Sequence, residues 1–294
     1  MSDRPDIAIV GPGVVGTALG LAAARAGYRV AAVGGRNAER SRAAAARIGP
    51  NVASGDPPAA AACADLVLLT VIDEAIEPVG RALAEAGAFR TGAVVAHCSG
   101  ALPGEVLAPA RGRCGAAVGS MHPLQTFPDA DSAVERLAGT HFFIEGDAAA
   151  RAALEALATG VGGVPVRIAP GAKLLYHAAA VLACNGLTTL LDASLAAAGH
   201  AGIEAASALA AVEGLVRATV DNGFRLGPAA ALTGPVARGD AALVAREAAA
   251  LHAADPALGR LYRALAAWTC ELALRKGSID ARQAGAVRRA LEAE

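Results

Sequence analysis

Aromatic residues and net charge are both scarce in this 294-residue chain, and each shortage excludes a class of protein. Aromatic side chains make up 3% of the residues, and 26 lysines and arginines nearly balance 27 aspartates and glutamates, for a formal net charge of -1. A chain without excess positive charge lacks the surface that binds nucleic acids or acidic membranes, so we expect neither as a partner. With 54% apolar and 18% charged residues, the chain is too hydrophobic to be disordered.

Cysteine is sparse too, and its spacing is informative. The five cysteines lie far apart and include no Cys-x-x-Cys pair: Cys63, Cys98, Cys114, Cys184 and Cys270. An odd number of isolated cysteines is typical of reduced thiols and not of a disulfide framework or a zinc site. We therefore expect no bound metal.

Long hydrophobic runs are also missing. The N-terminal MSDRPDIAIVG has no basic segment followed by an apolar one, which is the pattern of a secretion signal. The longest apolar stretch, 174–198, is interrupted by His177, Asn185 and Asp192, whereas a membrane span needs about 18 strongly apolar residues in succession. We expect a soluble, cytoplasmic protein.

The first half of the chain alternates between short apolar runs and helical segments. The runs, bounded by Gly, Pro or charge, are 6–11, 28–33, 65–71, 92–97, 114–119 and 141–144. Helical segments at 14–26, 37–47, 74–87 and 101–109 separate the earlier ones, and a last helix and strand follow at 148–160 and 164–168. This alternation predicts the α/β class with a doubly wound parallel sheet.

The second half contains no convincing strand pattern. After Pro170-Gly171 the helical segments are 172–198, 203–223, 240–253, 256–276 and 280–292. Asp255-Pro256 and Ser278-x-Asp280 have the chemistry of helix starts. We predict a Rossmann domain at 1–170 and an all-helical domain for substrate binding and dimerisation at 171–294.

The motif GPGVVG directly follows the first predicted strand and opens a helix. Gly11 allows a tight turn, Gly13 lets the backbone approach a pyrophosphate, and Gly16 lets helix and strand pack closely. Val14 and Val15 begin the helix, whose free N–H groups and positive dipole favour phosphate. A tight strand-to-helix turn without a ligand is the structural alternative.

The end of the second predicted strand indicates which dinucleotide binds. NAD enzymes of this type carry an acidic residue there, for the ribose 2′-hydroxyl, but this chain reads AVGGRNAER. Arg36, Asn37 and Arg40 suit a 2′-phosphate instead, because guanidinium groups bind phosphate in a bidentate manner. We predict NADP(H), with a solvated helix start as the alternative reading.

Other strand ends carry further candidates. The backbone of Thr70 and Val71 is expected beside the cofactor ribose, while Asp73 is expected to cap the next helix. Ser99 is a candidate contact to the nicotinamide ribose or a substrate carboxylate.

The segment SMHPLQTF is predicted to be a loop after the strand 114–119. His122 and Gln125 are candidate substrate ligands there, because loops at strand ends carry function, although a turn held by Pro123 is an equal alternative. His97, Cys98 and His122 have poor spacing for a metal site.

The predicted helix in APGAKLLYHAAAVLACNG carries three polar groups on an apolar background. Lys173 and His177 are four residues apart and share a helix face, and Asn185 lies farther round the helix. A lysine in a dinucleotide enzyme can donate a proton to a carbonyl or imine as hydride reaches the carbon. The alternatives are an interdomain salt bridge or capped helix start, and a core histidine.

The segment LTGPVARGD places Thr233 and Arg238 around a Gly-Pro turn. Arg238 is a candidate clamp for a substrate carboxylate, and Thr233 a candidate substrate contact. An Arg238–Asp240 pair at a helix start is the alternative.

Lys-x-x-x-polar after a GxGxxG Rossmann domain resembles the β-hydroxyacid dehydrogenase, ketopantoate reductase and 6-phosphogluconate dehydrogenase superfamily. Those enzymes have Lys-x-x-x-Asn, with Lys as general acid and Asn as substrate ligand; here Lys173 matches the Lys and His177 replaces the Asn. The segments 119–127, 173–185 and 232–240 together resemble a bacterial family in which a Rossmann-like domain precedes a helical domain of unknown function. That family is described as short-subunit-dehydrogenase-like or deazaflavin/NADP-oxidoreductase-like.

The resemblance implies an NADP(H)-dependent oxidoreductase that transfers hydride to or from a small carbonyl substrate, possible examples being keto acids such as ketopantoate. Lys173 is the implied general acid and His177 the residue that orients the substrate. Alternatives are an imine reductase of the pyrroline-carboxylate type, a deazaflavin-linked NADP reductase, or a non-catalytic NADP-binding sensor. We expect a homodimer that binds a small molecule.

Overall fold

The computed structural model describes residues 4–127 and 129–292, and its chain divides into two compact units, Met1–Leu182 and Ala183–Glu294. The division lies inside the segment predicted as the first helix of the second half, beyond the predicted boundary at 170/171. Residues 173–182 of that helix thus belong to the first unit, in which the Lys173 side chain is buried.

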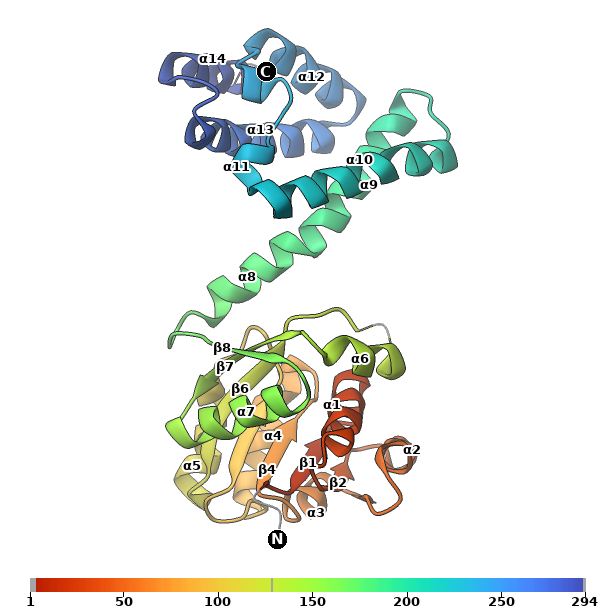
Figure 1. The fold of residues 1–294 in the computed structure, drawn as a ribbon, viewed down its shortest axis with the longest axis vertical. Helices are drawn as coiled ribbons and strands as arrows, with labels where there is room; N and C mark the ends of the chain where they lie inside the picture. Colours follow the sequence, from red (N-terminus) through yellow and green to blue (C-terminus); the bar gives the residue numbers. More distant parts are fainter. Residues whose placement is uncertain (1–3, 128, 293–294) are drawn as a thin grey trace. The chain divides into compact units, whose positions relative to one another are not determined.

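The first unit is built on one eight-stranded sheet with the strand order β3-β2-β1-β4-β5-β6-β7-β8 (Figure 1). The strands are β1 Ile7–Val10, β2 Val30–Gly34, β3 Ala53–Gly55, β4 Leu66–Leu69, β5 Val94–His97, β6 Ala117–Pro123, β7 His141–Gly146 and β8 Val164–Arg167. This order confirms the predicted Rossmann sheet. One junction differs from the prediction of a wholly parallel sheet, because β6 and β7 pair antiparallel.

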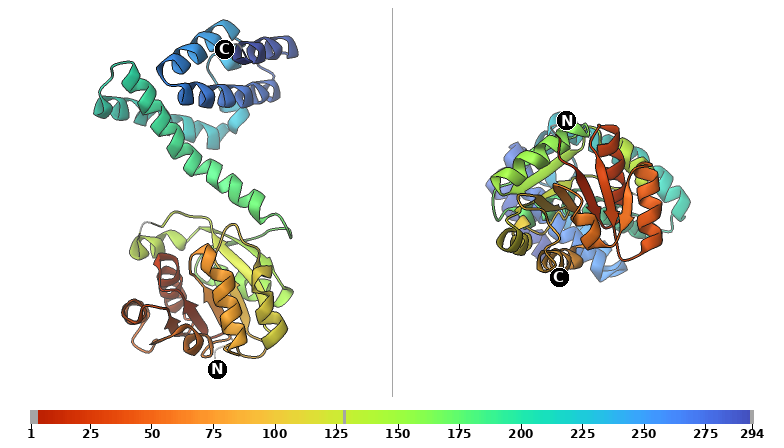
Figure 2. Two further views of the ribbon diagram at one scale, coloured as in Figure 1. Left: turned by 180° about the vertical axis from the view of Figure 1, so that it is seen from behind. Right: turned by 90° about the horizontal axis from the view of Figure 1, so that it is seen from below.

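Helices cover both faces of this sheet (Figure 2). They are α1 Val14–Arg25, α2 Ala38–Ile48, α3 Pro57–Ala61, α4 Asp73–Glu85, η1 Gly104–Leu107, α5 Ala108–Cys114, α6 Ala130–Leu137 and α7 Ala148–Gly160. Alternate residues of β1 face opposite cores: Ile9 packs with residues of α1, α2, α6 and α7, and Val10 with residues of α3, α4 and α5. Burial on both faces explains why these strands appear in the sequence as continuous apolar runs.

Three short elements of the first unit were not predicted from the sequence: β3, α3 and α6. Strand β3 is Ala-Ser-Gly and is largely exposed, so it has no apolar run to reveal it. The predicted helix at 101–109 is a 3-10 turn, η1, followed by α5, and β6 continues to Pro123, four residues past its predicted end at 119.

Every regular element in the described residues from 173 onward is a helix. These are α8 Lys173–Ala183, α9 Asn185–His200, α10 Ala205–Leu226, α11 Pro228–Ala231, η2 Val236–Arg238, α12 Ala241–Ala254, α13 Pro256–Lys276 and α14 Ala281–Glu292. Asp255 accepts a hydrogen bond from the N–H of Ala257 and Asp280 from that of Gln283, which confirms both predicted helix starts. The core of the second unit joins α12, α13 and α14.

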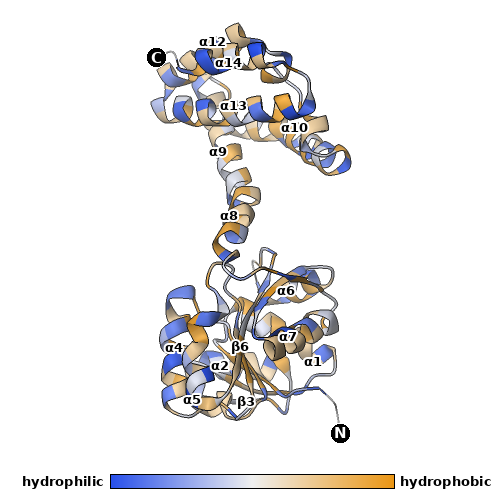
Figure 3. Cartoon of the chain, turned by 90° about the vertical axis from the view of Figure 1, so that its left-hand side faces the viewer, coloured by the Kyte–Doolittle hydropathy of each residue, from blue (hydrophilic) through white to orange (hydrophobic). Residues whose placement is uncertain are grey.

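The predicted helix 172–198 is interrupted at Cys184, where ψ falls to -70°. A helical periodicity counted from Lys173 therefore does not continue to Asn185 and the residues after it. Residues 173–200 are nevertheless long and apolar enough, by length and composition, to cross a membrane, and Figure 3 shows the apolar residues along α8 and α9. A lone stretch of this kind is weak evidence for a span, and the cytoplasmic location stays a prediction.

Candidate functional site

The glycine loop between β1 and α1 is packed against the end of β4. Gly11 has φ +109°, and a Cβ there would lie 2.8 Å from the carbonyl carbon of Thr70. A Cβ on Gly16 would lie 2.3 Å from the Thr70 hydroxyl oxygen and 2.5 Å from the carbonyl oxygen of Gly11. A Cβ on Gly13 would meet nothing within 4 Å among the described residues. Gly11 and Gly16 thus serve close packing, whereas the backbone at Gly13 is open.

The N-terminus of α1 is suited to an anion. Gly13 is the cap residue, Val14 and Val15 form the first turn, and the N–H groups of a first helical turn have no intrahelical acceptor. Within the described chain, no side chain caps this helix and its first turn carries no acidic residue. The free N–H groups and the helix dipole therefore give this end a positive potential.

The segment after β2 lies beside the same loop. A Cβ on Gly35 would lie 2.7 Å from the ring of Pro12. Arg36 and Arg40 are exposed, and neither takes part in an ion pair among the described residues. The Asn37 side chain caps α2 by accepting a hydrogen bond from the N–H of Arg40 at 2.9 Å. Two unpaired guanidinium groups are thus available near the phosphate loop, while the Asn37 side chain already has a structural role.

Two predicted cofactor residues use their hydroxyl groups to hold the backbone. Thr70 donates to the carbonyl oxygen of Gly11 at 2.6 Å, which ties β4 to the glycine loop, and Val71 follows it. Ser99 donates to the carboxylate of Asp73 at 2.7 Å and accepts from two backbone N–H groups, at 3.1 and 3.0 Å. Asp73 was predicted to cap α4, which is wrong: it lies in the first turn, after the cap residue Ile72, and fixes Ser99 instead.

Lys173 is buried, with 2% of its surface exposed. Its Nζ donates to the carbonyl oxygen of Ser99 at 2.6 Å and to Oγ of Ser120 at 2.9 Å. An ammonium has three N–H groups, so one is left for another acceptor. Burial lowers the pKa of Lys173 from 10.5 to about 8, although the charges of Glu145, Cys98 and Asp73 oppose the shift. The lysine is therefore poised to exchange a proton near neutral pH.

Strands β6 and β7 supply the side chains that meet the first turns of α8. Their antiparallel register places Ser120 opposite Glu145 and His122 opposite Phe143. Because side chains alternate along a strand, these two pairs share one face of the sheet. His122 was predicted to lie in a loop, which is wrong: pairing with β7 extends β6 to Pro123.

An aromatic and imidazole cluster continues this surface. His122 Nδ1 and the hydroxyl of Tyr176 share a hydrogen bond of 2.8 Å, and the Tyr176 ring lies 4.2 Å from that of Phe143. The rings of His122 and His177 meet edge to face at 6.4 Å. Burial lowers the pKa of His122 to about 4 and raises that of Tyr176 to about 12, so both are neutral at pH 7.

His177 has an unsatisfied polar atom. Its Nδ1 is buried and has no hydrogen-bond partner among the described residues. A Cβ on Gly100 would lie 2.7 Å from this atom and 3.0 Å from Nε2 of His122. A buried nitrogen without a partner loses the stabilisation of a hydrogen bond, and a bound ligand can restore it.

His97 belongs to the support of the site. It is fully buried, its Nδ1 accepts from the N–H of Ser99 at 3.1 Å, and its Nε2 lies 3.1 Å from the carbonyl oxygen of Pro103. Burial lowers its pKa to about 4 and raises that of the Cys98 thiol to about 12. No group of three or more His, Cys, Asp or Glu residues that could hold a metal ion is found in the part of the chain that the structure describes.

The remaining predicted site residues lie elsewhere. Gln125 is exposed, and its Oε1 accepts from the N–H of Thr126 at 2.9 Å. Asn185, Thr233 and Arg238 belong to the second unit and are exposed. The predicted Arg238–Asp240 pair does not occur among the described residues, because Asp240 caps α12 through the N–H of Leu243.

Four residues of the site were not found from the sequence: Asp73 in its actual role, Ser120, Glu145 and Tyr176. Ser120 lies two positions before His122, so strand alternation places both on the same face, a usable signal once 117–123 is assigned as strand. Tyr176 shares the helix face of Lys173 at i+3. A further signal is that the chain has only two lysines, Lys173 and Lys276.

Comparison with known families agrees with this architecture. Residues 1–123 match the family described as a Rossmann-like domain, and residues 140–269 match a domain of unknown function, DUF2520. The chain therefore combines a Rossmann-like domain with a DUF2520 domain, as its resemblance to a two-domain bacterial family implied. No curated protein matches the sequence.

Solved structures with the same fold carry names of one class. A Bacteroides fragilis protein described as an NADP oxidoreductase is 24% identical, with a TM-score of 0.71 over 91% of this chain and 98% of its own. An imine reductase from Pseudomonas sp. is 19% identical, with a TM-score of 0.62 over 97% of this chain and 98% of its own. A reductive aminase from Aspergillus terreus, in complex with NADPH and ethyl-5-oxohexanoate, is 18% identical. Its TM-score is 0.60 over 98% of this chain and 93% of its own. At these identities the likeness establishes a shared fold.

Proposed function

We propose that this protein is an NADP(H)-dependent oxidoreductase that transfers hydride between the nicotinamide and a small substrate carrying a C=O or C=N group. The observation that carries the proposal is the buried Lys173, held by Ser99 and Ser120 beside β5 and β6 of a Rossmann sheet. Ligands of open α/β sheets bind outside the carboxyl ends of the strands. The names of the structures that share the fold support the same class.

The glycine loop fits a dinucleotide. Because the backbone at Gly13 is open, a pyrophosphate can approach it and accept hydrogen bonds from the first turn at Val14 and Val15. Thr70 and Val71 would contact the cofactor through their backbone, since the Thr70 hydroxyl is bonded to Gly11. The exposed, unpaired guanidinium groups after β2 support NADP(H) over NAD(H).

Lys173 would act as the general acid. When bound, the reduced nicotinamide supplies the hydride. The third N–H of the Lys173 ammonium donates a proton to the substrate oxygen or nitrogen as negative charge develops there. The unpartnered Nδ1 of His177 would orient the substrate. A pKa of about 8 suits a group that both gives and takes a proton near neutral pH.

The substrate is either a small keto acid, for which ketopantoate is the first candidate, or an imine. An imine substrate, including one of the pyrroline-carboxylate type, is favoured by the imine reductase and the reductive aminase that share the fold. Two more functions are compatible with NADP(H) binding: hydride exchange with a deazaflavin, and sensing of NADP(H) without catalysis.

The decisive experiment measures NADPH consumption with ketopantoate and with a panel of keto acids and cyclic imines. We compare the native protein with Lys173→Ala and with the matched control Lys276→Ala, which removes the other, exposed lysine. Lys173→Ala should lower turnover by about 100-fold or more while NADPH affinity changes little, and Lys276→Ala should behave as native. NADPH binding without turnover on any substrate would favour the sensor.

The pH dependence tests the role of Lys173 separately. As the acid, Lys173 must be protonated in the reductive direction, so kcat/KM should be level below about pH 8 and fall tenfold per pH unit above it. A rate that rises through this range would contradict a lysine acid.

We also propose that the active form is a homodimer. The support is the exposed apolar surface of α9 and α10 in the second unit, which includes a cavity of about 550 Å³ lined mainly by leucines and valines of these two helices. Contiguous apolar surface of this kind marks interaction sites.

A further inference from the structure

A continuous chain of hydrogen bonds leads away from Lys173 on the side of β6 and β7. Lys173 Nζ donates to Ser120 Oγ at 2.9 Å, and Ser120 Oγ donates to Glu145 Oε1 at 2.7 Å. Lys173 and Ser120 are 2% and 0% exposed, whereas Glu145 is only half-buried. Ser120 therefore links the buried ammonium to the half-buried Glu145 by hydrogen bonds.

The geometry of this chain is fixed by the backbone. Ser120 and Glu145 are directly opposite each other in the antiparallel register. The N–H of Gly104 donates to the same Glu145 oxygen at 2.6 Å, and a Cβ on Gly104 would lie 2.6 Å from the Cα of Gly119. Only a glycine at 104 lets η1 approach β6 closely enough to make this bond.

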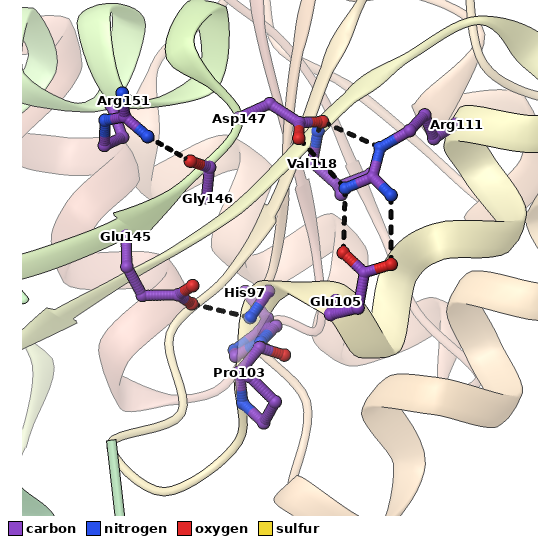
Figure 4. Close-up of polar contacts among 10 residues, drawn as sticks. His97, Pro103, Glu105, Arg111, Val118, Glu145, Gly146, Asp147 and Arg151 are labelled. Carbon is purple, nitrogen blue, oxygen red and sulfur yellow. Dashed lines mark hydrogen bonds and ion pairs between the residues drawn. The ribbon is translucent and has the colours of Figure 1, made fainter. Parts of the chain in front are cut away.

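Glu145 ends the chain at a polar cavity of about 500 Å³, which lies between η1, β6, β7 and the segment after β8. Figure 4 shows the carboxylate of Glu145 beside Pro103, with Arg111, Asp147 and Arg151 nearby. Neither the glycine loop nor His122 and His177 are among the residues that line this cavity. The cavity is thus separate from the proposed substrate side of Lys173.

The arginines that line this cavity are occupied by other acceptors. Arg111 pairs with Glu105 and Asp147 at 2.9 Å each, Arg151 donates to the carbonyl oxygen of Gly146 at 2.5 Å, and Arg167 pairs with Glu155 at 2.6 Å. No ion pair of the described residues includes Glu145. Its carboxylate therefore accepts hydrogen bonds from neutral donors and lines the cavity.

We propose that Glu145 and Ser120 relay protons from this cavity to Lys173 and so reprotonate the general acid between turnovers. This inference rests on the proposed function. When Lys173 has given its proton to the substrate, its neutral amine accepts the Ser120 hydroxyl proton. Ser120 Oγ in turn takes a proton from Glu145, whose carboxylate has first taken that proton from a hydronium ion or buffer acid in the cavity and so returns to the carboxylate form. One proton moves from solvent to Lys173, and the relay residues end as they began.

The first test separates the hydride-transfer step from the reprotonation of Lys173. Glu145→Gln keeps the shape of the side chain but cannot carry a proton, and Ser120→Ala breaks the chain in the middle. The first turnover uses the proton already on Lys173, so at about pH 6, where Lys173 is protonated with either residue at 145, Glu145→Gln should consume its first NADPH per site much faster than the later ones. Ser120→Ala also removes a hydrogen bond to Lys173, so each variant is judged by the ratio of its steady-state rate to its own first-turnover rate. Steady-state turnover should then fall by about ten- to a hundredfold, and small carboxylic acids should restore it to Glu145→Gln.

Glu105→Gln is the matched control. Glu105 lines the same cavity and the variant changes the charge by the same amount, but Glu105 bonds to Arg111 and not to Ser120. Its steady-state rate should stay within about twofold of native. Equal rates in Glu145→Gln and the native protein, or equal losses in Glu145→Gln and Glu105→Gln, would overturn the relay.

The second test needs neither substrate nor cofactor. Because the chain has two lysines, lysine labelled with carbon-13 at Cε gives two NMR signals, and Lys276→Arg assigns them. The other titratable groups facing the ammonium, namely Asp73, His97, Cys98 and His122, are unchanged in Glu145→Gln. Loss of the Glu145 charge should therefore lower the pKa of Lys173 by about one unit, and Glu105→Gln should leave it unchanged.

The two tests distinguish the failure of each idea. An unchanged Lys173 pKa in Glu145→Gln overturns the relay whatever the substrate is. A lowered pKa with no NADPH oxidation by the native protein on any substrate overturns the proposed function, and the relay with it.

Discussion

At the scale of single residues, the choice of lysine at position 173 is itself informative. Of the 26 basic residues, two are lysines, so arginine fills nearly every other cationic position. Arginine stays protonated under all physiological conditions, whereas burial brings the pKa of a lysine into the range where it exchanges protons. A position that needed only a positive charge would tolerate arginine, which is the common cation of this chain.

The buried histidines make a prediction about acid stability. The pKa of His97 is about 4 in the folded protein and 6.5 in the unfolded chain, so below pH 6.5 the unfolded state binds more protons and stability falls as pH falls toward 4. From pH 7.5 to 5.5 the free energy of unfolding should drop by about 1 kcal/mol on account of His97 alone. Urea unfolding at the two pH values measures the drop.

His97→Asn removes this contribution, so its drop over the same range should be smaller by about that 1 kcal/mol, even if the variant is less stable at both pH values. His200→Asn, at an exposed helix end, is the control and should show the native drop. A native-sized drop in His97→Asn would contradict the buried neutral histidine.

A second residue-scale prediction concerns the cofactor. Arg36→Ala and Arg40→Ala should each weaken NADPH binding by about tenfold and leave NADH binding nearly unchanged, because only NADPH carries the 2′-phosphate. Arg42→Ala removes the same charge from an exposed position on α2 and should have little effect on either cofactor. Binding titrations would contradict the preference if the two cofactors lost affinity equally.

At the scale of elements, the glycine loop and the antiparallel pair β6–β7 build the site in different ways. The loop is local: Gly11, Gly13 and Gly16 lie within one turn and need only β4 beside them. The pair β6–β7 is not local, because it joins strands separated by α6 and sets Ser120 against Glu145.

The loop can be tested with two conservative substitutions that separate packing from binding. Gly16→Ala places a Cβ 2.3 Å from the Thr70 hydroxyl oxygen and should lower the free energy of unfolding by about 1–3 kcal/mol. Gly13→Ala meets nothing within 4 Å among the described residues, so its stability should be native, while NADPH binding weakens because the phosphate loses its approach. Native NADPH affinity in Gly13→Ala would contradict a phosphate at this position.

The difference between local and non-local contacts explains what could be predicted from the sequence. The strand-loop-helix of the glycine motif and the shared face of Lys173 and His177 depend on contacts within a few residues, and both were predicted. Glu145 was missed because it adjoined a predicted strand end at 144 in a sheet expected to be parallel. Its importance depends on an antiparallel pairing that leaves no periodic signal. The break at Cys184 was missed because the alanines and leucines on either side favour helix, although Asn185 and Gly186 directly after it are weak helix formers.

At the scale of the whole molecule, the exposed apolar helices demand an explanation. The most apolar window of 173–200 is not buried within the described chain, and Phe224 on α10 is 90% exposed. A bilayer and a protein partner are the two environments that would cover such a surface. Charged residues lie among the leucines and valines of the α9–α10 cavity, including the Glu213–Arg217 pair. A polar rim of both signs around an apolar centre suits a protein interface better than lipid chains.

A second copy of this chain is the partner that we predict, because most oligomers pair like surfaces about a two-fold axis and mixed charges let such a surface complement itself. Leu187→Asp combined with Val216→Asp puts two charges into the α9–α10 cavity and should weaken dimerisation by about tenfold or more. Ala201→Asp, at the exposed turn between the same helices, adds charge outside the cavity and should leave the dimer intact. Sedimentation velocity over a concentration series measures the three proteins. A native protein that sediments as a monomer at every concentration, or that floats with lipid vesicles, would contradict the dimer and favour the bilayer as the cover of these helices.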